Sequence, residues 1–190
     1  CMRNLKGIRI DKSSGIIEVL SGEMLPTLAR KAAASGLRGL EWAVGIPGTI
    51  GGAVVMNAGA QEHCISDYLE SITTLSLKGE YKMIKGTDLN FGYRHSLLQN
   101  ENLIVLSARL KLVSGQAEII RQVTNENLNH RLRTQPYKSQ TCGSVFRNPE
   151  PLKAAKLIEE LGLKGFRCGG AEISKIHSNF IINANNASSY

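Results

Sequence analysis

The chain has 190 residues, of which 42% are hydrophobic, and a formal net charge of +7 at pH 7. A chain of this length can bury the core of one large or two small domains. Charged residues interrupt every apolar run, so no stretch approaches the roughly 18 to 20 apolar residues of a membrane span. The composition therefore predicts a soluble globular protein and excludes a membrane-spanning one.

The four cysteines, Cys1, Cys64, Cys142 and Cys168, are widely spaced and include no C-x-x-C pair. This spacing indicates neither a zinc site nor a disulfide framework, and scattered thiols fit a reducing cytoplasm. The basic charge is compatible with nucleic-acid binding, yet Lys and Arg are dispersed and aromatic residues are few. A protein that holds anionic phosphates has the same charge balance, so charge alone leaves both interpretations open.

The first half of the chain predicts short strands and one helix. Residues 5–10 and 16–20 are predicted strands, and residues 23–35 follow a helical pattern. Residues 68–77 and 81–84 form a predicted hairpin. A further strand is expected at residues 103–112, with Ile104, Leu106, Ala108 and Leu110 on one face.

The second half predicts a long helix followed by a smaller mixed region. Ser114 is expected to cap a helix that runs to about Arg133 and can bridge two lobes. Its expected apolar face carries Ile119, Ile120, Val123, Leu128 and Leu132. Beyond it we expect a strand at 144–147, a helix at 152–161 and a strand at 180–182.

Residues 41–61 read EWAVGIPGTIGGAVVMNAGAQ and place glycines among small and apolar residues. Glycine lets a backbone approach a ligand closely, and successive free N–H groups at a turn or helix start favour an anion such as pyrophosphate. The spacing matches neither G-x-G-x-x-G nor a Walker P-loop. Tight helix packing is the alternative explanation for the same glycines.

Two predicted loops each carry a candidate reacting residue. Residues 89–97, LNFGYRHSL, place Arg94 where its cation can bind an anion, although a solvated arginine is the alternative. Residues 133–149, RTQPYKSQTCGSVFRNP, contain Ser144, whose hydroxyl can pass a proton if nearby cations lower its cost of ionisation. A hydrogen-bonded turn serine is the alternative there, and no G-x-S-x-G elbow supports hydrolase chemistry.

Residues 165–183, GFRCGGAEISKIHSNFIIN, alternate polar and apolar side chains. Ser174, Lys175, His177 and Asn179 could therefore share one face of a strand. Such a face is usually solvated, but Lys and His among hydroxyl and amide donors also suit a phosphosugar.

These four segments occur in the order found in the UDP-N-acetylenolpyruvoylglucosamine reductase family, which the chain resembles over nearly its whole length. The matching motifs are IPGTIGGA with MNAGA, FGYRHS, CGSVFRNP and GGAEISKIHSNFIIN. The resemblance implies an α+β fold, with the second FAD-binding subdomain of vanillyl-alcohol-oxidase type in residues 1–115. It also implies a connecting helix at 116–137 and most of a smaller α+β substrate-binding domain at 138–190. The short connection before the helix resembles the family's shorter variant, which lacks an extra substrate-covering segment.

The resemblance further implies a reaction. In the family, NADPH reduces FAD, and the flavin then delivers hydride to the enolpyruvyl group of UDP-N-acetylglucosamine-enolpyruvate, giving UDP-N-acetylmuramate for peptidoglycan synthesis. Carried onto this sequence, Arg94 would stabilise charge on the substrate carboxylate and Ser144 would donate the proton. The implied FAD contacts are Ile46, Pro47, Gly48, Thr49, Gly51, Gly52, Ala53, Asn57, Gly59 and Ala60. The implied substrate contacts are Tyr93, Asn148, Lys175, His177 and Asn179.

Family members also have another FAD lobe before this region and a catalytic glutamate after it, and neither motif is present in the sequence. We therefore expect a chain truncated at both ends. A catalytically inactive nucleotide-sugar- or flavin-binding fragment of the same fold is the main alternative. A basic nucleic-acid-binding domain is a third hypothesis, which lacks a stacking platform. We expect a cytoplasmic protein with no metal, nucleic-acid, membrane or obligate protein partner.

Overall fold

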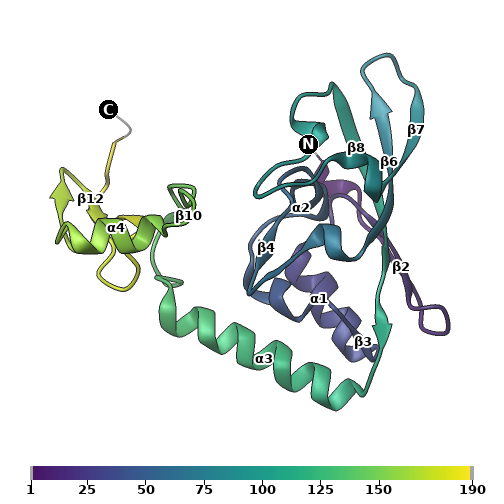
Figure 1. Ribbon diagram of the computed structural model, residues 1–190, viewed down its shortest axis with the longest axis horizontal. Helices are drawn as coiled ribbons and strands as arrows, with labels where there is room; N and C mark the ends of the chain where they lie inside the picture. The colour runs from purple at the N-terminus through teal and green to yellow at the C-terminus, as the bar shows by residue number, and fades with distance from the viewer. Residues whose placement is uncertain (1, 189–190) are drawn as a thin grey trace. The chain divides into compact units, whose positions relative to one another are not determined.

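A computed structural model describes residues 2–188 (Figure 1). Its contacts divide the chain into a first unit that ends at Leu128 and a second unit that begins at Asn129. Both units combine strands with helices, which confirms the expected α+β class. Within the described residues, no helix has the length and apolar character needed to cross a membrane.

The first unit is built on a five-stranded antiparallel sheet with the order β1-β2-β8-β6-β7. Its strands are β1 (Ile8–Asp11), β2 (Ile16–Leu20), β6 (Leu69–Ser76), β7 (Tyr81–Lys85) and β8 (Leu103–Lys111). The predicted hairpin is present as β6 and β7, whereas the first strand begins later than expected. Because β8 pairs with both β2 and β6, it joins two local hairpins into one sheet.

Two helices contribute apolar side chains to the cluster that covers this sheet. Helix α1 (Leu25–Ala34) has Pro26 in its first turn, where the missing N–H of proline costs nothing, and it is followed by Gly36 at a φ of 73°. Helix α2 (Ile50–Val55) lies within the glycine-rich segment and begins after Thr49. The remaining elements of the first unit are η1 (Met2–Asn4), β3 (Leu37–Arg38), η2 (Glu41–Gly45), β4 (Gly59–Ala60), β5 (His63–Cys64), η3 (Ile65–Asp67), η4 (Gly86–Leu89), η5 (Leu97–Gln99) and β9 (Val113–Ser114).

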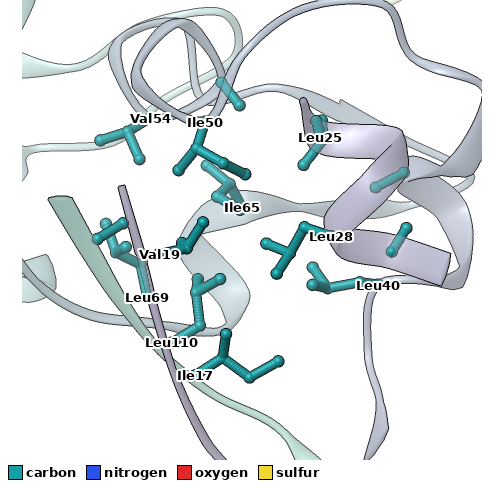
Figure 2. Packing of buried hydrophobic residues seen from close by; sticks show 14 of the residues in the cluster. Ile17, Val19, Leu25, Leu28, Leu40, Ile50, Val54, Ile65, Leu69 and Leu110 are labelled. Atoms are coloured by element: carbon teal, nitrogen blue, oxygen red, sulfur yellow. The ribbon is translucent and has the colours of Figure 1, made fainter. Parts of the chain in front are cut away.

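A continuous apolar cluster fills the space between the helices and the sheet. Figure 2 shows Leu28 of α1 and Ile50 of α2 directed toward Val19 and Leu110 of the sheet. Each of these four side chains is at most 1% exposed. Full burial of one such side chain stabilises the folded state by roughly 1.5 to 3 kcal/mol, so this cluster fixes the platform on which the loops of the first unit rest.

Strand β8 departs from the strict alternation that its sequence predicted. Thr73 pairs with Ser107, but the next residue, Thr74, pairs with Val105. Leu106 is therefore an extra residue, and a bulge of this kind reverses which side chains face the core. As a result Val105 is 6% exposed and Ile104 is 39% exposed. The expectation that Ile104 shares the buried face with Ala108 and Leu110 is wrong for this reason.

Helix α3 (Ala117–Thr134) takes the place of the predicted long helix and contains the boundary between the units. Ser114 does not cap it, because Ser114 pairs with Leu37 in the short ladder of β9 and β3. The buried residues of α3 are Ile120 and Thr124, which lie one turn apart. The other predicted face residues are more accessible: Ile119, Val123 and Leu132 are exposed and Leu128 is half-buried.

The second unit contains a four-stranded antiparallel sheet with the order β10-β13-β12-β11. Its elements are β10 (Thr141–Ser144), α4 (Ala154–Glu160), β11 (Arg167–Cys168), β12 (Ala171–Ile173) and β13 (Phe180–Asn183). The helix and the last strand were expected. The strand predicted at 144–147 lies earlier, as β10, and ends at Ser144; its register with β13 shifts between Thr141 and Ser144.

Candidate functional site

The predicted Arg94 loop is a tight turn in the first unit, closed by an antiparallel bridge between Gly92 and His95. The guanidinium of Arg94 donates from Nη2 to the carbonyl of Gly59 at 2.9 Å and from Nη1 to the carbonyl of Asn57 at 3.5 Å. Its Cζ also lies 5.2 Å from the centre of the Tyr93 ring, in cation–π range. The structure thus joins two motifs that are more than thirty residues apart, and the remaining guanidinium N–H groups can bind an anion.

The glycine-rich segment contains glycines that serve packing. The N–H groups of Ile50 and Gly51 donate to the carbonyls of Glu23 and Ser21, both at 2.9 Å. A Cβ atom built on Gly51 would lie 3.1 Å from the Cβ of Ser21. Gly51 therefore lets α2 approach the chain after β2, and the amides at the start of α2 are not all free for a ligand. Tight packing, the alternative explanation, holds at this glycine.

The turn before α2 has a different character. Gly48 is exposed at a φ of 134°, and a Cβ atom placed on it would meet nothing within 4 Å. Among the described residues, the N–H groups of Gly48 and Thr49 have no hydrogen-bond partner. The buried hydroxyl of Ser21, which follows β2, also lacks one. Free donors on bare backbone are the feature that an anionic ligand requires.

Asn57 connects the glycine-rich segment to the Arg94 loop. Its side chain is 6% exposed, its Nδ2 donates to the carbonyl of Gly92 at 3.0 Å, and its Oδ1 accepts the N–H of Ser66 at 3.3 Å. The amide is buried and holds two other segments through these bonds, so its main task is within the first unit. Nearby, a Cβ atom on Gly59 would lie 2.5 Å from the carbonyl oxygen of His63, so the β4–β5 hairpin also needs a glycine for close packing.

A cleft of about 720 Å³ opens beside the β4–β5 hairpin, and sequence reasoning did not find it. Its lining residues are Arg38, Gly39, Glu41, Trp42, Gln61, His63, Tyr68, Val113, Val123 and Asn127, all in the first unit. Burial raises the pKa of Tyr68, and the negative charge of Asp67 adds to the shift. The i, i+4 spacing of His63 and Asp67, whose Nδ1 and Oδ2 lie 3.4 Å apart, was the available sequence signal. None of the predicted site residues lines this cleft.

In the second unit, Ser144 is exposed at the end of β10, opposite Phe180. Its hydroxyl has no hydrogen-bond partner among the described residues. The segment that follows is held by Asn179, which accepts the N–H of Phe146 through Oδ1 at 2.9 Å and donates from Nδ2 to the carbonyl of Phe146 at 2.8 Å. Asn179 is buried, so its amide mainly holds this backbone.

The alternation of polar and apolar residues predicted a strand at residues 174–179, but these residues do not lie on one. They form the turn between β12 and β13, because the Oγ of Ser174 accepts the N–H groups of Ile176 and His177 at 3.2 and 3.3 Å. Ser174 and Asn179 are buried, whereas Lys175 is exposed. The predicted common polar face is therefore absent from this turn, and only some of these side chains are accessible.

His177 keeps one ring nitrogen available. Its Nδ1 accepts the backbone N–H of Asn179 at 3.2 Å, and its ring meets Phe180 edge-on with the ring centres 4.8 Å apart. Burial lowers the pKa of His177, and this favours the neutral ring. A neutral ring whose Nδ1 is an acceptor carries its proton on Nε2, so His177 can donate a hydrogen bond. Asn148, by contrast, uses its Oδ1 to accept the first N–H of α4, from Ala154, at 3.1 Å.

In comparisons with known proteins, each unit contains a stretch that matches a protein family. The FAD binding domain family matches residues 1–85, and the family described as UDP-N-acetylenolpyruvoylglucosamine reductase, C-terminal domain, matches residues 135–190. The UDP-N-acetylenolpyruvoylglucosamine reductases of Prochlorococcus marinus (strain NATL2A) and Synechococcus sp. (strain CC9605) are 88% and 56% identical over 189 residues. The alignments cover 100% and 98% of this chain, but 65% and 63% of those proteins.

A solved structure agrees with these matches. The crystal structure of UDP-N-acetylenolpyruvylglucosamine reductase from Thermus caldophilus has 40% sequence identity and a TM-score of 0.83, over 96% of this chain and 64% of that one. The fold is therefore that of a protein class in which an FAD binding domain is joined to a distinct C-terminal domain. The chain belongs to the UDP-N-acetylenolpyruvoylglucosamine reductase family, and it spans just under two thirds of the length of these relatives.

Proposed function

We propose that the chain carries the FAD-contacting and substrate-protonating parts of an NADPH-dependent reductase that converts UDP-N-acetylglucosamine-enolpyruvate to UDP-N-acetylmuramate. The observation that carries this proposal is the placement of the Arg94 guanidinium against the carbonyls of Asn57 and Gly59, in the same glycine-rich segment that has free amides at the turn before α2. Family membership and the names of the relatives support the same reaction. The expected setting is the cytoplasm and the expected role is cell wall synthesis.

The residues of the first unit fit FAD at the turn before α2. The free N–H groups of Gly48 and Thr49 would bind an anionic part of the cofactor. The hydroxyl of Ser21, which has no partner among the described residues, is a further polar group, on the chain that packs against Gly51 of α2. Ile46, Pro47, Gly52 and Ala60 remain proposed contacts of the surrounding surface, whereas Ala53 is buried in the apolar cluster and would act by packing beneath it. When bound, FAD supplies the hydride that NADPH provides and the enolpyruvyl group receives.

Arg94 would bind the substrate carboxylate and stabilise the negative charge that develops as hydride reaches the adjacent double bond. Its two hydrogen bonds to carbonyls leave further N–H groups of the planar guanidinium available, and no carboxylate among residues 2–188 pairs with the cation. Tyr93, whose ring contacts this cation, would lie beside the substrate.

Ser144 would donate the proton that completes the reduction. Its hydroxyl is exposed and unpartnered, so no bond within the described chain has to be broken before the proton moves to the enolate-like carbon of the substrate. Lys175 and the Nε2–H of His177 would contact the nucleotide sugar as donors. Asn148 and Asn179, whose side-chain oxygens accept backbone N–H groups, would act mainly by shaping this region.

Rapid-reaction kinetics on a chimera test the proposal. In the chimera the Prochlorococcus marinus (strain NATL2A) relative supplies the residues that this chain does not span. Arg94→Lys should leave flavin reduction by NADPH within about twofold and slow reoxidation by the enolpyruvyl sugar about tenfold or more, because an ammonium replaces a planar fork. Arg109→Lys, at an exposed ion pair with Glu18, is the matched control and should change neither step.

The two half-reactions separate the competing functions. An unaltered chimera whose reduced flavin is not reoxidised by the enolpyruvyl sugar would exclude the reductase. Flavin binding with no turnover would favour the inactive flavin-binding fragment. Reoxidation at the unaltered rate in Arg94→Lys would remove Arg94 from the site.

A further inference from the structure

Arg94 adopts a backbone conformation that arginine rarely takes. Its φ is 53°, in the left-handed region, at the turn between Gly92 and His95. A residue other than glycine keeps such a conformation only where its surroundings enforce it, and such residues concentrate at functional sites. The side chains that enforce it are therefore candidates for a role in the reaction.

Three polar side chains fix this turn to the C-terminal end of α2. Gln99 donates from Nε2 to the carbonyl of Arg94 at 3.0 Å and to the carbonyl of Val55 at 3.2 Å. Ser96, which is fully buried, donates from Oγ to the same Val55 carbonyl at 2.7 Å. Asn57 donates from Nδ2 to the carbonyl of Gly92 at 3.0 Å.

Two of these bonds hold the backbone of the turn, at Gly92 and Arg94, and another holds the side chain of Ser96 directly after it. Carbonyls in the last turn of a helix lack partners within the helix, so Val55 offers an acceptor that Ser96 and Gln99 share. Gln99 is the side chain that bonds the peptide of Arg94 itself. Without it, the strained φ can relax to a negative value, and the guanidinium would swing away from the carbonyl of Gly59.

We propose that Asn57, Ser96 and Gln99 are positioning residues that hold Arg94 in its left-handed conformation, so that the guanidinium is aligned before the substrate arrives. This inference rests on the proposed function of Arg94. It gives Asn57 a task within the first unit in place of direct contact with FAD. Gln99 is the most informative of the three, because its side chain is exposed and its loss leaves the apolar core intact.

Gln99→Leu in the same chimera tests the role, because leucine keeps the approximate bulk and removes the amide. Reoxidation of the reduced flavin by the enolpyruvyl sugar should slow about tenfold, since misplacement of a binding group by about 1 Å costs up to about 100-fold. Reduction by NADPH should stay within about twofold. Gln122→Leu, which removes a similar exposed amide from α3, is the control and should leave both steps unchanged.

Two outcomes would overturn the inference: unaltered reoxidation in Gln99→Leu, or equal slowing of both half-reactions, which would indicate a general structural defect. Failure of the reductase proposal is distinguishable, because the chimera without substitutions would then not reoxidise its flavin at all.

A second measurement needs neither flavin nor turnover. In the 190-residue chain, the NMR order parameter of the Arg94 amide should be near the rigid value of about 0.85 and should fall below about 0.6 in Gln99→Leu. The order parameter should stay unchanged in Gln122→Leu. A rigid Arg94 amide in Gln99→Leu would show that the other contacts suffice, and Gln99 would lose its assigned role.

Discussion

The two units bury different kinds of side chain. The first unit encloses a continuous apolar cluster that includes Leu28 and Leu110, whereas the buried apolar residues in the described part of the second unit are Pro136, Ala154 and Phe180. Both units bury polar residues, but in the described part of the second unit these outnumber the apolar ones; they are Glu172, Ser174, Ser178 and Asn179. Apolar burial is non-directional, while a buried polar group is stable only when its hydrogen bonds are made. The second unit therefore depends on a few directional contacts.

The same difference appears around the two proposed reacting residues. Arg94 is fixed through its own carbonyl and guanidinium, on a platform supported by the apolar core of the first unit. Ser144 is exposed, and the order of its surroundings comes from the bonds of Asn179 to the backbone of Phe146. A large guanidinium needs alignment to bind a planar anion, whereas a hydroxyl can rotate about one bond to deliver a proton.

The largest expected effect is a loss of activity at Ser144 in the second unit, without a matching loss of stability. Ser144→Ala in the chimera should slow flavin reoxidation by the enolpyruvyl sugar about 10²- to 10⁴-fold, the usual contribution of a proton donor. Reduction by NADPH should remain nearly intact, and the free energy of unfolding should change by less than about 0.5 kcal/mol because the site is exposed. Stopped-flow absorbance and urea unfolding measure the two quantities. Equal losses in both half-reactions would rule out a proton-donor role.

Replacing leucine by alanine should lower the free energy of unfolding by different amounts at a buried and at an exposed position. Leu28→Ala should lower the free energy of unfolding by about 2 to 5 kcal/mol, because Leu28 is 0% exposed in the first unit. Leu161→Ala, at a side chain that is 72% exposed in the second unit, should change it by no more than about 0.5 kcal/mol. Urea unfolding followed by circular dichroism gives both values. Similar losses would contradict the burial of Leu28 and the exposure of Leu161.

Truncation of a polar side chain should matter more than that of Leu161 in the second unit. Asn179→Ala should destabilise this unit by about 1 to 3 kcal/mol, because the N–H and carbonyl of Phe146 lose their partners. Hydrogen exchange at Phe146 reports the loss locally, and exchange in the first unit serves as the internal control. Unchanged protection at Phe146 would mean that water replaces Asn179 without cost.

The smallest effect is a stabilisation in the first unit. Gln61 and Glu62 form the two-residue turn between β4 and β5, with φ values of 54° and 66°. A turn with two positive φ values favours glycine at its second position, so Glu62→Gly should raise stability by up to about 1 kcal/mol. Glu62→Ala, which also removes the carboxylate but keeps a Cβ atom, is the matched control. A gain in both variants would attribute the effect to charge instead of backbone conformation.

Much of the local structure followed from the sequence. The pattern of residues 68–84 predicted the β6–β7 hairpin, and the helical pattern of residues 23–35 predicted α1, because both depend on neighbours in the chain. Ser114 and Ile104 were misassigned for non-local reasons. Ser114 pairs with Leu37, and the bulge at Leu106 arises from pairing with β6.

The sequence by itself determined the family, the α+β class and the motifs that contain Arg94 and Ser144, because these depend on residue identity and order. Only the tertiary structure decided which groups within each motif are free. It showed that the amides of Ile50 and Gly51 are used in packing while those of Gly48 and Thr49 are not. It also placed Gln99 on the peptide of Arg94. Hydrogen bonds between distant segments depend on backbone geometry, which the order of residues does not reveal.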